Sequence, residues 1–327
     1  MTRFVTGRIF GSLLLILAAL TCIFFFIHLA PGDPVELFLG HDSTEEQRLI
    51  IESKLGLDKS IYKQFGSWIT GVVLHGDLGD SLRSGRPVST ELADVIPNTL
   101  FLASCSFILH LIIAIPLGVW MAHRSGSKLE RVTMSTGLIV YSLPSFWLGL
   151  MLILVFCRLL GWLPSGGMNS VDLEWMSPGQ QFLDTLRHLV LPVFVLGVST
   201  VIGTARYVRA SVLEVLQKDF ILSARARGLS KNRILWNHAL RNSLLPIITI
   251  VGLNIPFLLG GAVITETIFS WPGMGRLTVE AIFARDYPII MGAVTVSAFM
   301  VVLGNLLADL GYAFVDPRIK LRSGGGK

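Results

Sequence analysis

Six long apolar segments, none of which contains Asp, Glu, Lys or Arg, constrain this chain more than any other feature of its sequence. Each is close to the length of about 20 residues that an α-helix needs to cross a bilayer. One charge at the centre of such a helix would cost roughly 2.5–3.5 kcal/mol. The segments are Ile9–Ala30, Thr99–Ala122, Val132–Cys157, His188–Ala205, Leu244–Thr265 and Pro288–Ala308. Because lipid admits only helices and closed barrels, we expect an all-α, polytopic membrane protein with six transmembrane helices.

The composition excludes a soluble globular chain. Hydrophobic residues make up 52% of the 327 residues and charged residues only 15%, whereas soluble domains carry about 25% charged residues. Cys22, Cys105 and Cys157 all fall inside apolar segments, so they are interpreted as small buried hydrophobic residues and not as disulfide partners or metal ligands. The net charge of +5 does not indicate a nucleic-acid partner, because the basic residues sort by side of the membrane.

The connecting segments predict the orientation in the membrane. With the N-terminus inside, the inner segments hold 17 Lys and Arg against 5 acids, and the outer segments hold 10 against 17. Cytoplasmic loops carry the excess of Lys and Arg, so both termini are expected in the cytoplasm. We expect an N-terminal helix with a large outer loop over 1–98, a five-helix core over 99–313 that includes the inner loop 206–243, and a cytoplasmic tail over 314–327.

The inner stretch Phe220–Pro246 is the most basic part of the chain. Two short helices are predicted in it, the first ending at Gly228, which suits a left-handed turn, and the second beginning with Ser230 as N-cap. One interpretation is a loop that only fixes orientation through its positive charge. The other is a docking hairpin for a soluble partner.

The same stretch resembles the cytoplasmic EAA loop of ABC-importer permeases. The match lies in the spacing of Ser223-Ala224, Gly228, His238 and Leu240. The residue types at 224–229 (Ala-Arg-Ala-Arg-Gly-Leu) and 238–242 (His-Ala-Leu-Arg-Asn) are similar to those of the dipeptide/oligopeptide/nickel branch. The Glu that names the loop is Leu222 here, so no salt bridge is carried over from it. The resemblance implies that the residues coupling to the ATPase are Ser223, Ala224, Arg225, Gly228, Leu229, His238, Leu240 and Asn242.

The outer loop 31–98 is too long for a simple connection. Helical stretches are expected over Ser43–Leu55 and Ile61–Leu74, followed by a Gly/Asp/Ser-rich turn over Gly76–Ser81. The loop could be a folded cap on the membrane surface, a contact surface for a soluble binding protein, or both.

Pro144 lies inside the third segment and predicts a kink, because proline removes a backbone hydrogen bond. The kink could be static or could line a pore; the family has a Ser-Xaa-Pro-Xaa-Phe motif here. A second family match, Glu266–Gly275, is similar to an outer re-entrant turn, in which Glu266 could be functional or paired locally and Trp271 suits the membrane interface. The candidate pore-lining residues are Ser142, Pro144, Phe146, Asn254 and Glu266.

Motifs for catalysis are absent from the sequence. There is no P-loop pattern, His-Glu-x-x-His, Cys-x-x-Cys or nucleophile elbow, so we expect no ATP hydrolysis by this chain, no catalytic residue, no metal site and no cofactor.

The resemblance implies a type I ABC-importer-like permease in the cytoplasmic (inner) membrane. Its implied partners are a second permease subunit, two cytoplasmic ATPase subunits and an extracytoplasmic substrate-binding protein, with translocation by alternating access. A short peptide is ranked ahead of nickel or a metal chelate as substrate. The alternatives from other classes are a membrane scaffold that transports nothing, for which kinked helices and a basic docking loop would be unnecessary, and a membrane-embedded enzyme, for which paired catalytic groups are missing.

Overall fold

The computed structural model describes residues 2–29, 58–243 and 262–315, and these are helical throughout apart from turns and one antiparallel bridge between Asp80 and Pro87. The all-α prediction is confirmed. Within the described ranges, four helices are long and apolar enough to cross a membrane, and one bent pair of helices makes a fifth candidate. Most of the predicted fifth segment, including Asn254, lies outside the described residues, as do the predicted helix Ser43–Leu55 and the tail.

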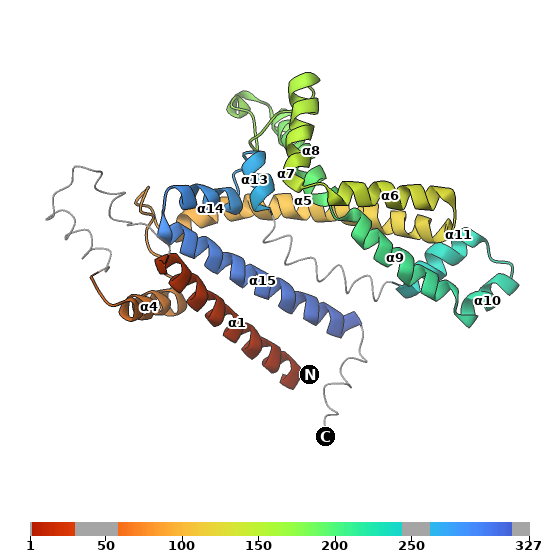
Figure 1. Ribbon diagram of the computed structural model, residues 1–327, viewed down its shortest axis with the longest axis horizontal. Helices are drawn as coiled ribbons and strands as arrows, with labels where there is room; N and C mark the ends of the chain where they lie inside the picture. The colour runs from red at the N-terminus through yellow and green to blue at the C-terminus, as the bar shows by residue number, and fades with distance from the viewer. Residues whose placement is uncertain (1, 30–57, 244–261, 316–327) are drawn as a thin grey trace. The chain divides into compact units, whose positions relative to one another are not determined.

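The backbone packs as two compact units, which are described separately; one contains residues 2–99 and 272–303. Its core joins the start of α5 to α14 and α15 through Val88, Leu92, Met274, Ala281 and Ile289, all nearly or fully buried. The helices with residues in this unit are α1 (Thr2–Leu29), α4 (Ile61–Thr70), α5 (Val88–His123), α14 (Met274–Phe283) and α15 (Tyr287–Val315), which Figure 1 labels, and the π-helical η1 (Gly71–His75).

Aromatic side chains attach α4 to α1. Phe24 of α1 lies between Phe65 and Trp68 of α4, with ring centroids 5.2 and 5.5 Å apart. The i, i+3 spacing of Phe65 and Trp68 puts both rings on one face of the helix. The predicted helix at Ile61–Leu74 is therefore present, as α4 followed by η1, and its aromatic face packs within the chain.

Asp286 anchors the Gly/Asp/Ser turn of the same unit. Its carboxylate is 3% exposed, accepts the Ser81 hydroxyl at 2.6 Å, and accepts the backbone N–H groups of Leu82 and Arg83 at 3.2 Å each. It also accepts the N–H of Ile289 at 3.4 Å, which makes it the N-cap of α15. One buried carboxylate thus begins a long helix and fixes a loop that lies about 200 residues earlier in the chain.

The second unit contains residues 100–271 and the chain from Gly304 onward. Its largest buried cluster brings Val119 of α5, Val208 and Val212 of α9, and Leu235 and Ala239 of η4 together. Beyond α5 and α15, its helices are α6 (Lys128–Ser142), α7 (Ser145–Leu152), η2 (Ile153–Leu159, π), η3 (Leu173–Trp175, 3-10), α8 (Pro178–Val198), α9 (Val201–Leu216), α10 (Asp219–Ala226), α11 (Lys231–Arg233), η4 (Ile234–Leu240, π) and α13 (Val263–Ile268).

The third apolar segment is broken at Pro144, as Figure 1 shows where α7 turns away from α6. Proline disfavours the helical conformation of the residue before it, and Leu143 accordingly is extended, with φ −72° and ψ 133°. The two helical halves, Lys128–Ser142 and Ser145–Leu159, meet at 95°. The predicted kink is present, but it is a complete helix break and not the bend of one continuous helix.

The fourth apolar segment differs from its predicted bounds. The helix α8 begins ten residues earlier than His188, at a capping box in which Ser177 and Gln180 bond reciprocally, and it ends at Val198. The rest of the predicted segment belongs to α9. The absence of charged residues sets the bounds of the predicted segment, whereas the capping box at Ser177 determines where the helix itself begins.

His110 of α5 occupies the break between α8 and α9. The carbonyl oxygen of Gly197 can only accept, so the Nδ1–H of His110 donates to it at 3.0 Å. The Nε2 atom then accepts from the hydroxyl of Thr204 at 2.9 Å. Both ring nitrogens are used in joining three helices, so His110 is a packing histidine.

Candidate functional site

The basic stretch forms a hairpin of α10, α11 and η4, which we call the coupling hairpin (residues 219–243). At its turn Gly228 has φ +77°, and its N–H donates to Arg225 O at 2.9 Å while Leu229 N–H donates to Ala224 O at 3.3 Å. This pair of bonds is a Schellman motif, which ends a helix with a left-handed residue. The predicted helix end at Gly228 is confirmed.

The second arm of the hairpin begins at Ser230. Its backbone is extended, and its hydroxyl accepts the N–H of Arg233 at 3.4 Å, so the predicted N-cap is confirmed. The helix then continues as η4 to Leu240. A well-defined turn and a defined cap within three residues hold the two arms in one fixed arrangement.

One face of the coupling hairpin is buried against the protein. Ile221 and Ala224 of α10 and Ile234 of η4 are at most 3% exposed and pack together with Leu216 and Leu229. The hydrophobic contact between the turn and the preceding helix usually accompanies a Schellman motif. The hairpin is therefore a packed element and not a loop that merely carries charge.

The second arm is packed on the helices behind it. Leu235 and Ala239 of η4 are buried against Val208 and Val212 of α9 and Val119 of α5. Well-packed interiors transmit displacement because they have few voids. A movement of the hairpin is therefore expected to move α9.

The opposite face of the hairpin is exposed and both apolar and basic. Phe220, Leu222 and Trp236 have exposures of 41, 58 and 46%. None of the basic residues on the hairpin forms an ion pair within the described ranges of the chain; these are Arg225, Arg227, Lys231, Arg233 and Arg241. Exposed aromatic and aliphatic side chains rimmed by charge are typical of a protein-binding surface.

The predicted coupling residues divide between these two faces. Ser223, Arg225, Gly228 and Asn242 are exposed, and the Asn242 amide donates to His238 O at 2.6 Å. Ala224 is 1% exposed and belongs to the inner face. The partly buried residues of the predicted set are Leu229, His238 and Leu240. Small size at Ala224 is thus required by packing within the hairpin.

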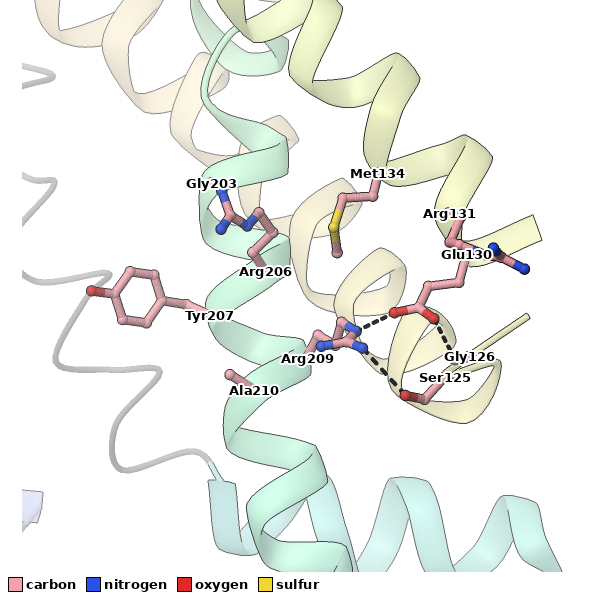
Figure 2. Close-up of a pocket in the computed structure, with 10 residues that line it drawn as sticks. All are labelled: Ser125, Gly126, Glu130, Arg131, Met134, Gly203, Arg206, Tyr207, Arg209 and Ala210. Carbon is pink, nitrogen blue, oxygen red and sulfur yellow. Dashed lines mark hydrogen bonds and ion pairs between the residues drawn. The ribbon is translucent and has the colours of Figure 1, made fainter. Parts of the chain in front are cut away.

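A cavity of about 860 Å³ lies between α6 and α9, and Figure 2 shows its walls. On one side Glu130 is 4% exposed, receives the Nε–H of Arg209 and also accepts the N–H of Gly126 at 2.6 Å. Ser127, whose hydroxyl caps α6, precedes it. Sequence reasoning missed this ion pair; the only signal was an acid among the many basic residues of the inner loops.

The candidate pore-lining residues lie in different places. Ser142, Pro144 and Phe146 flank the break between α6 and α7 and are exposed, Phe146 at 50%. Glu266, in α13, is fully buried. The three residues at the helix break are therefore exposed on the surface of the chain, whereas Glu266 is enclosed by the chain's own packing.

Phe269 and Trp271, in the turn after α13, are also buried. Ser270 has φ +50°, Phe269 O accepts the N–H of Gly167 at 2.8 Å, and Trp271 has 0% exposure, packed with Leu102 and Leu189. The indole of Trp271, which the sequence led us to expect at the membrane interface, is enclosed by the chain itself. The tight approach of Gly166 to the Phe269 carbonyl, where an added Cβ would come within 2.7 Å, explains how the turn packs.

Comparison with known proteins identifies the family. Residues 114–321 match the family described as binding-protein-dependent transport system inner membrane component, and residues 1–103 match its N-terminal region. The oligopeptide transport system permease protein AppB of Bacillus subtilis is 42% identical over 98% of this chain and 100% of its own length. The dipeptide transport system permease protein DppB of Escherichia coli is 39% identical over 91% and 92%. The glutathione transport system permease protein GsiC of Pectobacterium atrosepticum is 35% identical over 98% and 100%.

A solved structure shows the same fold at lower similarity. A chain of the methionine ABC transporter MetNI, in inward-facing conformations, superimposes with a TM-score of 0.57 and 19% identity, covering 69% of this chain and 97% of the other. Both family matches and the relatives extend over nearly the whole sequence, including the coupling hairpin. This chain belongs to the family of inner-membrane components of binding-protein-dependent transport systems.

Proposed function

We propose that this chain is one of two permease subunits of an ATP-driven importer of short peptides, which a soluble binding protein delivers and two ATPase subunits drive. The chain is the multi-pass inner-membrane permease component of such a transporter and is not itself an ATPase. The peptide substrate is supported by the relatives, which are described as oligopeptide, dipeptide and glutathione permeases.

The observation that carries the coupling role is the two-faced packing of the coupling hairpin. Its inner face is buried against α9, and its outer face presents Phe220, Leu222 and Trp236 among unpaired basic side chains. Such a surface fits a soluble partner with an apolar groove and an acidic rim. The charge distribution predicts that both termini, and with them the coupling hairpin, lie on the cytoplasmic side. The exposed outer face of the hairpin would then meet the ATPase subunits.

The mechanism that follows is alternating access by two-state movement. ATP-driven closure of the ATPases pushes the outer face, the buried contacts of Leu235 and Ala239 carry the displacement to α9, and the permease changes which side of the membrane it opens to. In this proposal Ser223, Arg225, Gly228 and Asn242 contact or position the ATPase, and Ala224 and Leu229 hold the hairpin together. The exposed residues Ser142, Pro144 and Phe146 at the helix break stay candidates for the pore.

Co-purification of the ATPases with substituted permeases tests the docking surface. Trp236→Glu places a charge on the outer face without touching the buried cluster, so the protein should insert normally and lose its ATPases. The control is Phe283→Glu, at the end of α14, where the side chain is 86% exposed and the ATPases should be retained. ATPase retention by Trp236→Glu, with normal uptake, would contradict the docking role.

The substrate is tested on the assembled transporter in vesicles. ATP hydrolysis should rise when the binding protein is added with di- or tripeptides, and should not rise with Ni²⁺ or a nickel chelate. A response to nickel alone would indicate that the substrate is nickel or a nickel chelate and not a peptide. The named relatives do not specifically support nickel as the substrate. A folded chain that binds no ATPase and transports nothing would favour the scaffold alternative.

A further inference from the structure

The cavity between α6 and α9 has a net positive lining that the transport mechanism does not use. Three arginines contribute to it, from both helices: Arg131, Arg206 and Arg209. Glu130 is the only acid among the lining residues, and it is engaged by Arg209. Figure 2 shows Arg209 directed at Glu130 and Ser125, with Arg131 and Arg206 on opposite sides of this pair.

Arg131 and Arg206 have no acidic partner in the part of the chain that the structure describes. Both side chains are exposed, and they stand on different helices, α6 and α9. An arginine presents five N–H donors in a planar fork that matches phosphate geometry. Two such groups around a shared cavity are suited to an anionic ligand that carries phosphate.

Apolar surface continues directly from the cavity. Met134 and Tyr207 line it, and Tyr207 is 59% exposed. Along the same face of α6, four and seven residues after Met134, the side chains of Leu138 and Tyr141 are 38 and 55% exposed. A free phosphate would gain nothing from this surface, whereas acyl chains would cover it.

We propose that this cavity binds the headgroup of an anionic phospholipid, with Arg131 and Arg206 on the phosphate and the exposed face of α6 against the acyl chains. The location fits, because the cavity begins at the basic turn after α5 and extends along a helix of the bent candidate span, where headgroup and hydrocarbon meet. Basic pockets between transmembrane helices recognise lipid headgroups in this way. Glu130 pairs with Arg209 and neutralises its charge. The two remaining arginines, Arg131 and Arg206, therefore give the site its net positive charge.

Native mass spectrometry of the purified transporter complex, exchanged from lipid nanodiscs into detergent, tests the proposal. Phosphatidylglycerol should stay bound where phosphatidylcholine does not. Arg131→Gln with Arg206→Gln should reduce phosphatidylglycerol retention by about 25-fold, since each basic group near a membrane surface contributes about fivefold. Arg158→Gln with Arg187→Gln, the same charge change at exposed arginines of η2 and α8, should leave lipid retention unchanged. Equal loss in both double variants would overturn the site.

A steric variant separates lipid binding from charge and from misfolding. A Cβ on Gly203 would meet nothing within 4 Å, so Gly203→Trp can enter the cavity with every arginine in place. It should displace phosphatidylglycerol, and Gly203→Ala should not. Competition by millimolar inorganic phosphate would assign the site to a free anion and overturn the lipid proposal. Lipid bound to the lone chain but absent from the assembled complex would show that a partner subunit covers the cavity, and would overturn it as well.

Discussion

Glu130 and Arg209, 79 residues apart in sequence, meet at 2.5 Å between Oε1 and Nε. The Glu130 side chain is 5% exposed and the Arg209 side chain 25%. The second carboxylate oxygen accepts the backbone N–H of Gly126, and an Arg209 Nη donates to Ser125 Oγ at 3.2 Å. The pair fixes the turn between α5 and α6 onto α9, the helix on which the coupling hairpin packs.

Glu130→Gln should destabilise the protein by about 2 kcal/mol. The neutral amide leaves the Arg209 charge without its partner and weakens the bond from Gly126, and charged hydrogen bonds of this kind are worth about 1.5–3 kcal/mol. The apparent melting temperature in detergent checks this. Glu214→Gln is the matched control, since Glu214 is 73% exposed and pairs only with Lys218, so a loss of at most about 0.5 kcal/mol is expected. Equal effects of both variants would show that the buried pair has no special role.

Gly228→Val should uncouple transport without preventing insertion. The residue must hold φ +77°, a conformation that costs an L-residue roughly 1–2 kcal/mol and that a β-branched residue tolerates least. The hairpin turn would reopen and the outer face would lose its geometry. Uptake and ATPase co-purification measure the result. Gly228→Asn, which adopts the left-handed conformation more easily, should retain more of both activities; if Asn and Val behave alike, the turn conformation is not what matters.

Gly118→Leu should separate α5 from α9. A Cβ at this position would come within 2.5 Å of the Val208 Cβ and 2.6 Å of the Ala205 carbonyl oxygen, so no larger residue fits. Overpacking of this kind costs about 1–3 kcal/mol. Thermal unfolding in detergent is the measurement, with Gly11→Leu as control because a Cβ on Gly11 would meet nothing within 4 Å. An unchanged melting temperature for Gly118→Leu would contradict the close helix contact.

Asp286→Ala should release the loop that follows Ser81. The substitution removes the acceptor of the Ser81 hydroxyl and of two backbone N–H groups, so the backbone at Arg83, whose side chain is already exposed, is freed to enter the active site of trypsin. Cleavage after Arg83 should rise by up to about 30-fold, the factor that a loss of roughly 2 kcal/mol allows. Asp94→Ala, which removes only the exposed pair with Arg86, should leave the cleavage rate nearly unchanged. Equal protection in Asp286→Ala would contradict the anchoring role.

The sequence predicted those features that depend on local chemistry. Gly228 ends a helix because only a small residue adopts its dihedral angle readily, and Ser230 begins one because its hydroxyl accepts a backbone N–H. Proline at 144 disfavours a continuous helix, so a kink was predictable from the sequence, whereas the complete break and its angle of 95° depend on tertiary packing.

Other features depend on contacts that the linear pattern does not contain. Neither Asp286 nor Glu130 differs locally from an exposed acid, and only the folded chain shows that each is buried with long-range partners. Trp271 has the composition of an interfacial residue and is nevertheless enclosed, because α13 returns into the helix packing. Ala224 matched a docking motif by spacing, and its burial shows that the motif also encodes the interior of the hairpin.

The length of α5 has a further consequence for the membrane around this protein. The helix has 36 residues and at 1.5 Å per residue rises about 54 Å, well beyond the roughly 30 Å of bilayer hydrocarbon. Its first turns carry Glu91 and Asp94, so they extend into water unless the helix tilts strongly. Each 5.4 Å or so by which a bilayer is thinner uncovers about one more turn of an upright helix. Acyl-chain length is therefore a physical variable to which this permease is sensitive, independently of nucleotide or substrate.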